Sequence, residues 1–379
     1  MAGFGRFSAP RRVLHKTVPS EGNTGSAERR GSVSFSVSLP METTGCTLSV
    51  LSDDTGEIRN YAVYDGKITL SCEELCGGAC DGLFFYKFIV KTQSGSYEIV
   101  RAADGISDTL RDRRDGFDGA FVLTVYEKRN NPPSWLYGGI IYHIFVDRFF
   151  RGGDEPCRED AVINGDWENG IPPYVKKPGD RLDNNVFFGG DLYGIIKKLP
   201  YISSLGVTCI YLSPVFEAYS NHKYDTGNYD KVDDMFGGEE AFSSLADECE
   251  KCGIKLILDG VFNHTGDDSI YFNRRGRYGN GGAYRDRNSP YYEWYHFTEY
   301  PEKYESWWGI DVLPRVMSDT PSYKAYIFGE KGVIRKRLRE GVGGFRLDVA
   351  DELSDEFLSE LKTAAETEKK DCVIIGEVG

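Results

Sequence analysis

The stretch Gly344-Phe345-Arg346-Leu347-Asp348 reads as a short apolar strand that ends in an acid, with an arginine two residues before that acid. A second stretch, Ile374-Ile375-Gly376-Glu377, again places a carboxylate directly after apolar residues. Side chains two residues apart on a strand point to the same face, so Arg346 and Asp348 are predicted to lie side by side. The two stretches together predict a sheet whose strands end in acidic side chains.

Outward from these stretches, apolar strands alternate with helical segments. Strands are predicted over residues 140–146, 208–212, 254–258, 344–347 and 372–375. Residues 192–199 and 242–249 carry apolar side chains at i, i+3, i+4 and i+7, which is typical of an amphipathic helix. Five such units in series favour a parallel sheet in a (β/α)8 TIM barrel, of which about the first five strands are present. A doubly wound open sheet gives the same rhythm, but no glycine-rich phosphate loop follows the first strand.

The segment before the barrel has a different pattern of polar and apolar residues. Residues 31–130 contain short alternating runs such as Val33-Ser34-Phe35-Ser36-Val37, separated by turn residues, and predict an all-β immunoglobulin-like sandwich. Residues 1–30 are polar and rich in Gly, Ser and Arg, so we expect them to be poorly ordered. The partial barrel is predicted over 131–379, with 266–322 as a subdomain inserted after the third barrel strand.

Composition and charge disfavour several classes of partner. A net charge of −14 argues against nucleic acid and anionic membranes, and no stretch is long and apolar enough to span a bilayer. The nine cysteines lack the framework of a small secreted fold and no secretory signal is visible, so we expect free thiols and a cytoplasmic protein. Cys72, Cys76 and Cys80 are spaced by four, but no fourth ligand lies nearby and we expect no metal there.

The paired acids suggest glycosidase chemistry, because that reaction uses one carboxylate as nucleophile and another carboxyl group as acid. A structural salt bridge between Arg346 and Asp348, and an ordinary acid at position 377, are the alternatives. Aromatic residues make up 13% of the chain, which suits stacking on the flat faces of sugars as well as core packing.

Three segments resemble, in order and spacing, three of the four signature segments of the α-amylase family, glycoside hydrolase family 13. They are Asp259-Gly260-Val261-Phe262-Asn263-His264, Gly344-Phe345-Arg346-Leu347-Asp348 and Ile375-Gly376-Glu377-Val378. A further stretch, Asn221-His222-Lys223-Tyr224-Asp225-Thr226, is most similar to the neopullulanase and cyclomaltodextrinase branch, whose members carry an N-terminal β-sandwich. The resemblance implies a retaining hydrolase of α-1,4 glucosidic bonds, with α-1,6 bonds as a second linkage, in maltodextrin, starch or pullulan. Glucan transfer or branching, and glucan binding without catalysis, are the alternatives.

The resemblance also implies a role for each matched residue. Asp348 corresponds to the nucleophile, Glu377 to the general acid/base, and Arg346 to the cation that keeps the nucleophile ionised. His264 and His222 correspond to histidines that hydrogen-bond the sugar, and Tyr142 resembles the tyrosine that stacks on it. Asp259, Asn263 and Asp225 are expected to orient their neighbours, while Trp307 and Trp308 belong either to the cleft wall or to the core.

Calcium is implied in the same way, with Asp154, Gly189 and Asp191 matching oxygen ligands of the family. Arg151-Gly152-Gly153 stands where relatives often have asparagine, and this weakens the match. No organic cofactor is expected.

An α-glucan is the expected partner, and the N-terminal domain is a candidate for homodimer formation. The fourth signature segment, a His-Asp pair after a seventh strand, has no counterpart here. Five strands cannot close a barrel, so we expect this chain to be a piece of a longer protein.

Overall fold

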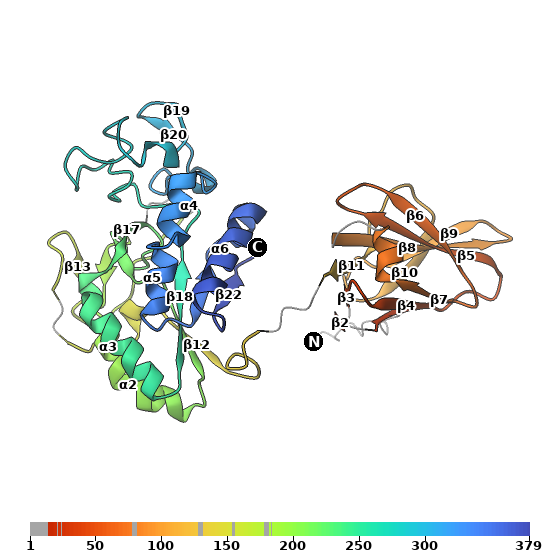
Figure 1. Ribbon diagram of the computed structural model, residues 1–379, viewed down its shortest axis with the longest axis horizontal. Helices are drawn as coiled ribbons and strands as arrows, with labels where there is room; N and C mark the ends of the chain where they lie inside the picture. Colours follow the sequence, from red (N-terminus) through yellow and green to blue (C-terminus); the bar gives the residue numbers. More distant parts are fainter. Residues whose placement is uncertain are drawn as a thin grey trace, which may run out of the picture. The chain divides into compact units, whose positions relative to one another are not determined.

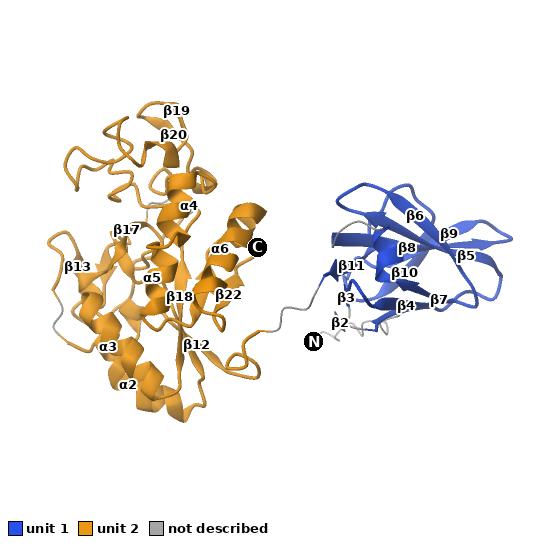
Figure 2. Ribbon diagram, viewed as in Figure 1, with its two compact units in different colours: residues 1–131 blue, residues 132–379 orange. Residues whose placement is uncertain are grey.

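The computed structural model describes residues 14–20, 22–23, 25–77, 82–127, 132–153, 156–177, 182 and 184–379. The chain divides into two compact units, residues 1–131 and residues 132–379 (Figure 2). Among the described residues, no helix has both the length and the apolar character needed to cross a membrane.

The first unit is built from two β-sheets. One sheet contains β1 (His15–Pro19), β4 (Ser32–Val37) and β7 (Lys67–Ser71), and the other contains β10 (Asp108–Asp112), β9 (Ser96–Arg101), β8 (Gly82–Thr92), β11 (Phe121–Tyr126), β3 (Ser26–Glu28) and β2 (Gly22–Asn23). Strand β5 (Thr43–Ser52) pairs with β8 and with β6 (Ile58–Val63), and a short helix α1 (Cys72–Cys76) follows β7. The alternating sequence of β4 buries Val33, Phe35 and Val37 in a core that they share with Leu48 and Phe88 of the other sheet.

The expectation of poor order over residues 1–30 is wrong for part of this range. Strand β1 pairs antiparallel with β4, and β3 pairs parallel with β11. The Leu14 and Ala27 side chains are buried in the core of the unit, and this burial explains why a polar segment folds onto the sheets. Residues 1–13 lie outside the described residues. Cys80 also lies outside them, while the Cys72 and Cys76 side chains are buried.

The second unit contains a parallel sheet whose strands neighbour one another in chain order. They are β12 (Ile141–Ile144), β15 (Cys209–Leu212), β18 (Lys255–Gly260), β21 (Gly344–Leu347) and β22 (Val373–Gly376) (Figure 1). Helices α2 (Leu192–Ser204), α3 (Gly238–Lys251) and α6 (Asp355–Glu368) each connect two successive strands, and α4 (Pro321–Phe328) and α5 (Val333–Arg339) precede β21. This order is that of a barrel wall, since a doubly wound sheet reverses its strand order at a switch point.

The two faces of this sheet differ in what they contact. Ile210, Leu212, Leu258, Phe345 and Leu347 belong to the main core that the helices complete. The alternate residues form a separate small cluster on the opposite face, made of Cys209, Ile257 and Val373 with the half-buried Trp135, Leu136, Tyr211 and Ile375. Alternation along each strand therefore sends one set of side chains to the helices and the other set to the inner face.

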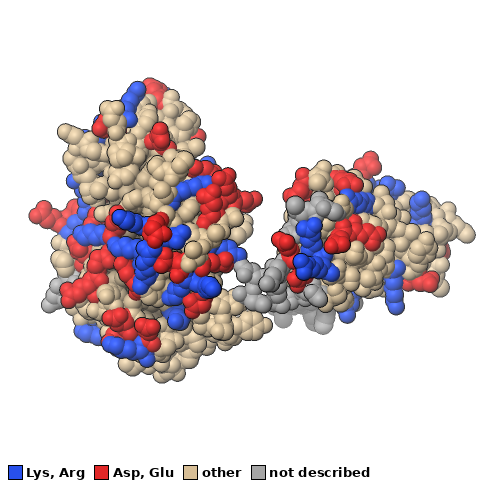
Figure 3. All heavy atoms as spheres, in the orientation of Figure 1, with Lys and Arg blue, Asp and Glu red and all other residues tan. Residues whose placement is uncertain are grey.

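A long insertion separates β18 from α4, as expected for residues 266–322. It contains one short hairpin, β19 (Phe297–Glu299) with β20 (Lys303–Tyr304), and 3-10 turns η3 (Tyr292–Trp294) and η4 (Trp307–Gly309). Phe272 packs against Phe297 and Tyr304, which gives the insertion an aromatic core. The part around β19 and β20 carries few charged side chains on the face shown in Figure 3, whereas acidic and basic residues are interspersed elsewhere on this unit.

Candidate active site

The predicted acidic residues meet at the carboxyl ends of three neighbouring strands. Asp259 is the penultimate residue of β18, Asp348 follows β21 directly, and Glu377 follows β22 directly. Arg346 lies opposite Asp259 in the register of β18 and β21 and opposite Ile375 in that of β21 and β22. The parallel register therefore gathers three carboxylates around one guanidinium.

Arg346 contacts all three acids. Its Nη1 donates to Asp259 Oδ1 and Oδ2 at 3.0 and 3.1 Å and to Asp348 Oδ1 at 2.9 Å. Its Nη2 lies 2.6 Å from Glu377 Oε1. One guanidinium thus bridges both predicted catalytic carboxylates. Its planar group holds the N–H donors in a fixed geometry, which suits such a bridge.

The Arg346 guanidinium favours the ionised form of Asp348, but other groups around this carboxyl oppose it. Burial and the nearby Asp259 carboxylate raise the pKa of Asp348 to about 7, although the Arg346 cation acts in the opposite direction. The Asp348 side chain is only 11% exposed, so solvent stabilises its ionised form only weakly. Glu377 is a further carboxylate nearby that raises the pKa of Asp348.

Glu377 is held by backbone contacts as well as by Arg346. The Val349 N–H donates to Glu377 Oε2 at 3.1 Å, and the Ala350 N–H donates to the Glu377 carbonyl at 2.9 Å. Val349 has a φ of 42°, a left-handed backbone that a β-branched residue rarely adopts and that is often found at functional sites. The Glu377 side chain is 46% exposed, so the described residues do not supply the burial expected for a general acid.

A cavity of about 620 Å³ opens above these strand ends. It is lined by His222, Tyr224, His264, Trp307, Trp308, Leu313, Arg346, Asp348, Val349, Asp351, Glu352, Glu377, Val378 and Gly379. The size is that of a site for a small organic ligand, and aromatic, acidic and histidine side chains share its wall. Of the predicted residues, Asp348, Glu377, Arg346, His264 and His222 line it together.

His264 is the clearest sign of an absent hydrogen-bonding partner. The residue is 1% exposed. Within the described part of the chain neither ring nitrogen has a partner at hydrogen-bond geometry, although the Tyr224 backbone lies near enough to raise the pKa of His264 against the effect of burial. The ring stacks on Trp307 at 5.3 Å between centroids, and burial lowers the pKa of His264 to about 4. A neutral imidazole with one free donor and one free acceptor suits a sugar hydroxyl, which can both donate and accept.

His222 already has polar partners. Its Nδ1 accepts from the Tyr224 N–H at 3.1 Å and lies 3.0 Å from Ser220 Oγ, while its Nε2 lies 3.0 Å from Asn184 Nδ2. Burial lowers the pKa of His222, with Asp225 opposing that shift. The structure therefore places His222 in the cavity wall as a neutral, oriented ring.

Tyr224 is in the cavity and Tyr142 is not, contrary to the sequence prediction. Tyr142 packs against the main core with Phe149, at 6.2 Å between ring centroids. Tyr224 lines the cavity and donates to Asp259 Oδ2 at 3.0 Å. Its position between His222 and Asp225, two predicted site residues, was a signal that could have identified it.

The residues predicted to orient their neighbours are themselves buried, and each has a polar partner. Asp259 accepts from the hydroxyls of Tyr211 and Tyr224 as well as from Arg346. Asp225 accepts from the Ser220 N–H at 3.1 Å, and Asn263 Nδ2 donates to Glu352 Oε2 at 3.3 Å.

Glu352 also holds the tryptophan pair, a role that the sequence did not indicate. Its Oε1 accepts from the Trp307 and Trp308 indole N–H groups at 3.2 and 2.8 Å. The two indoles stack at 4.9 Å between centroids, and Trp308 is 78% exposed at the cavity rim. Both tryptophans therefore belong to the cleft wall, the first of the two expectations.

Of the residues matched to calcium ligands, Asp191 has both carboxylate oxygens occupied by N–H donors. Asp191 is the N-cap of α2, and its two carboxylate oxygens accept from the Gly152, Gly153 and Gly194 N–H groups at 2.6–3.0 Å. Arg151 Nη2 donates to the Phe188 carbonyl beside Gly189, and Lys197 Nζ donates to the Gly152 carbonyl. Asp154 lies outside the described residues. Hydrogen-bond donors thus occupy the Asp191 carboxylate, whose oxygens a cation at this position would need.

Comparisons with known proteins agree with this geometry. The model of a family described as "Alpha amylase, catalytic domain" matches residues 143–379. The chain is 40% identical over 292 residues to an amylopullulanase of Thermoanaerobacterium saccharolyticum, covering 68% of this chain and 22% of that protein. It is 34% identical over 253 residues to neopullulanase 2 of Thermoactinomyces vulgaris, covering 65% of this chain and 40% of that protein.

A solved structure extends the similarity to most of the chain. The type III pullulan hydrolase from Thermococcus kodakarensis superposes with a TM-score of 0.55 at 25% identity, covering 92% of this chain and 59% of that one. The chain spans less than half the length of the amylopullulanase and the neopullulanase. Because the family model covers well over half of the sequence and includes Arg346, Asp348 and Glu377, the chain belongs to the α-amylase family of glycoside hydrolases.

Proposed function

We propose that this chain carries the catalytic centre of a retaining α-glucan hydrolase. Its substrates would be maltodextrin, starch or pullulan, cleaved at α-1,4 bonds and also at α-1,6 bonds. The observation that supports this most is the Arg346 guanidinium, which holds Asp348 and Glu377 at adjacent strand ends. The unpartnered His264 ring in the same cavity offers hydrogen bonds to a sugar hydroxyl.

The proposed reaction is a double displacement. Asp348 attacks the anomeric carbon while Glu377 protonates the departing glycosidic oxygen, which leaves a glycosyl ester on Asp348. Glu377, now ionised, removes a proton from water, and that water cleaves the ester and regenerates both carboxyl groups. Two inversions at the same carbon retain the anomeric configuration. Asp348 must be ionised to attack, so a pKa of about 7 predicts that this step accelerates as pH rises through neutrality.

Release of reducing ends from pullulan and maltodextrin by the full chain tests this proposal. Asp348→Asn keeps the size of the side chain but removes the nucleophile, and we expect it to abolish release. Asp355→Asn is the matched control, because Asp355 lies exposed in the first turn of α6 and does not line the cavity. Equal rates for the parent chain and Asp348→Asn would contradict the catalytic assignment.

Two observations favour second candidate functions. The exposed Trp308 at the cavity rim offers a stacking surface for an acceptor sugar, which favours glucan transfer. The 46% exposure of Glu377 favours glucan binding without turnover. Chromatography of the products separates these functions: transfer yields oligosaccharides longer than the substrate, while binding alone yields none.

We also propose that the five parallel strands are the first part of a (β/α)8 barrel. The chain order of the strands supports this, as do the half-buried Tyr211 and Ile375 on the inner face, where further strands would cover them.

A homodimer through the N-terminal unit is proposed as well, and sedimentation of the full chain at the mass of a monomer would contradict it.

An intracellular location is proposed from the cysteines. Cys46, Cys72, Cys209 and Cys249 are buried thiols that form no disulfide among the described residues, as expected in a reducing compartment. Fractionation of the source cells would test it, and recovery of the protein outside them would contradict it.

A further inference from the structure

The loop between β16 (Phe216–Ala218) and β17 (Thr226–Val232) carries two side chains of the cavity wall. His222 and Tyr224 line the cavity, while Lys223 between them does not and is fully buried. A fully buried lysine is unusual, because burying a charge is costly unless it is paired. The contacts of Lys223 must therefore explain why a lysine is buried between two residues of the cavity wall.

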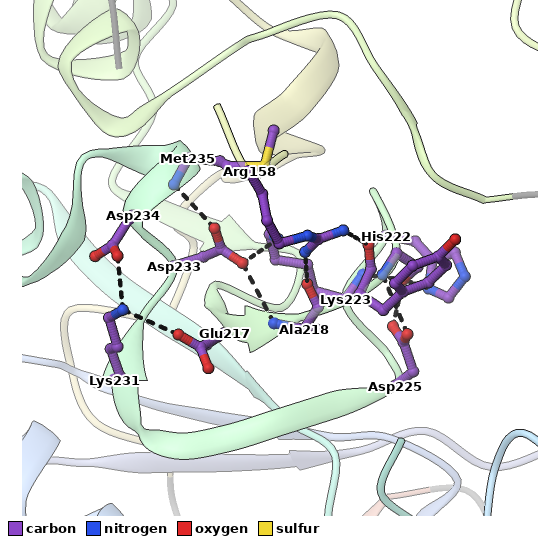
Figure 4. Close-up of polar contacts among 12 residues, drawn as sticks. Arg158, Glu217, Ala218, His222, Lys223, Asp225, Lys231, Asp233, Asp234 and Met235 are labelled. Carbon is purple, nitrogen blue, oxygen red and sulfur yellow. Dashed lines mark hydrogen bonds and ion pairs between the residues drawn. The ribbon is translucent and has the colours of Figure 1, made fainter. Parts of the chain in front are cut away.

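Lys223 is paired with Asp233 at the far end of the same hairpin (Figure 4). Its Nζ lies 2.5 Å from Asp233 Oδ2, and the ammonium sits over the rings of Phe187 and Phe236 at 5.3 and 4.7 Å from their centroids. Burial alone would raise the pKa of Asp233, but the Lys223 charge and backbone donors lower it overall. The Asp233 carboxylate is therefore ionised, and both side chains of the pair are closed to solvent.

Asp233 is itself fixed by the backbone. Its Oδ1 accepts from the Met235 N–H at 2.9 Å, as the N-cap of η2 (Asp234–Phe236), and its Oδ2 accepts from the Ala218 N–H at 3.3 Å. The contact with Ala218 joins Asp233 to the start of the loop (Figure 4). Lys223 is thus tied to an acceptor that has little freedom to move.

The backbone at Lys223 has a conformation that must be stabilised by contacts of its side chain and its N–H group. Its φ of 59° is left-handed, a conformation that a non-glycine residue adopts only when its surroundings impose it. The Lys223 N–H donates to Ser220 Oγ at 2.9 Å, and Ser220 in turn contacts Asp225 and His222. The turn at Lys223 is therefore what brings the Tyr224 N–H to His222 Nδ1.

We propose that Lys223 is a positioning residue, whose buried ion pair with Asp233 holds the turn that presents His222 and Tyr224 to the glucan. The role in glucan binding rests on the proposed function, whereas the effect of the pair on the loop does not. A lysine suits the position because its flexible stem reaches between two aromatic rings and its compact ammonium meets a single carboxylate oxygen.

The test compares the full chain with Lys223→Met and with a matched control. Lys231→Met is that control, since Lys231 lies on β17 and pairs with Glu217 and Asp234 at 3.0 and 2.6 Å, but is 39% exposed and does not line the cavity. Amide hydrogen exchange is followed by mass spectrometry in peptides covering residues 218–226 and, as a reference, 208–213. Affinity for maltotetraose is measured from the tryptophan fluorescence change.

We expect Lys223→Met to speed exchange of the 218–226 peptide at least tenfold and to leave the 208–213 peptide unchanged. We expect its maltotetraose Kd to rise at least tenfold, while Lys231→Met matches the parent chain in both measurements. If Lys223→Met does not fold, Asp233→Asn replaces it, because the amide keeps an acceptor for the Met235 N–H while removing the charge.

Each remaining outcome has a definite meaning. Unchanged exchange of the 218–226 peptide in a folded variant overturns the proposal, and so does faster exchange with unchanged maltotetraose affinity. Faster exchange in a chain that binds no maltotetraose even without substitution supports the role of the ion pair in holding the loop and contradicts the proposed function instead.

Discussion

Arg346 supplies a single positive charge to three carboxylates, and this imbalance governs the chemistry of the site. A guanidinium offers five N–H donors but only one charge, so it can satisfy the geometry of Asp259, Asp348 and Glu377 without neutralising all of them. Burial of the Asp348 carboxyl group, together with the uncompensated charges of Asp259 and Glu377, therefore raises the pKa of Asp348. A site that needs a reactive carboxylate therefore costs the fold some stability.

The stability of the chain should accordingly depend on pH through Asp348. Its pKa is about 7 in the folded chain and about 4 in an unfolded one, so the folded state holds an extra proton between these values and loses stability as pH rises through them. We expect Asp348→Asn to raise the free energy of unfolding by on the order of 1–3 kcal/mol at pH 8 and to change it little at pH 4. Urea unfolding at both pH values measures this, and an equal effect at each would contradict it.

His264 should be a binding residue whose effect does not depend on protonation near neutrality. With a pKa lowered to about 4, the ring stays neutral from pH 5 to pH 8. Loss of one or two hydrogen bonds in His264→Ala should weaken maltotetraose binding by about 1–3 kcal/mol, measured by tryptophan fluorescence across that pH range. His296→Ala is the control, because His296 is 53% exposed and pairs with Glu305 outside the cavity. Unchanged affinity in His264→Ala would remove His264 from the binding site.

At the scale of single elements, helix α2 shows how a predicted ligand can serve the fold instead. Asp191 caps the first turn of α2 and ties it to Gly152 and Gly153 in the loop after β12. An acid at a helix N-terminus is stabilised by exposed N–H groups and by the helix dipole, without any metal. The sequence pattern alone does not separate this role from metal ligation.

Chelation should therefore leave the chain intact. We expect the midpoint of thermal unfolding to be the same in millimolar EGTA and in millimolar calcium. The reason is that both carboxylate oxygens of Asp191 already accept hydrogen bonds from backbone N–H groups. Asp191→Ala should lower stability by about 1–2 kcal/mol in both solutions, through loss of the cap. A midpoint that rises on addition of calcium would show that the ion binds here after all.

On the scale of the whole molecule, each compact unit has a main hydrophobic core of its own among the described residues. Phe88 is fully buried in the first core and Phe345 in the second. Each large-to-small change should cost about 3–5 kcal/mol in its own unit. In scanning calorimetry we expect Phe88→Ala and Phe345→Ala to lower different transitions, and a single transition that both variants shift equally would show that the two units unfold together.

The sequence by itself determined the features that depend on local spacing. Alternation marked β4 as a sandwich strand, and the two-residue separation of Arg346 and Asp348 placed both on one face of β21. Apolar runs and helical periods predicted the parallel strands in the correct order. These patterns need only the geometry of a strand or a helix, which a short stretch of chain already specifies.

Only the tertiary structure decided what depends on contacts between distant segments. Tyr142 is next to Ile210 in the sheet register and faces the helices, whereas Tyr224 reaches the cavity because Lys223 turns the backbone before it. The raised pKa of Asp348 likewise depends on burial and on the acids Asp259 and Glu377 from the two neighbouring strands. Register, burial and shared charge arise when segments far apart in sequence pack together, so no local pattern contains them.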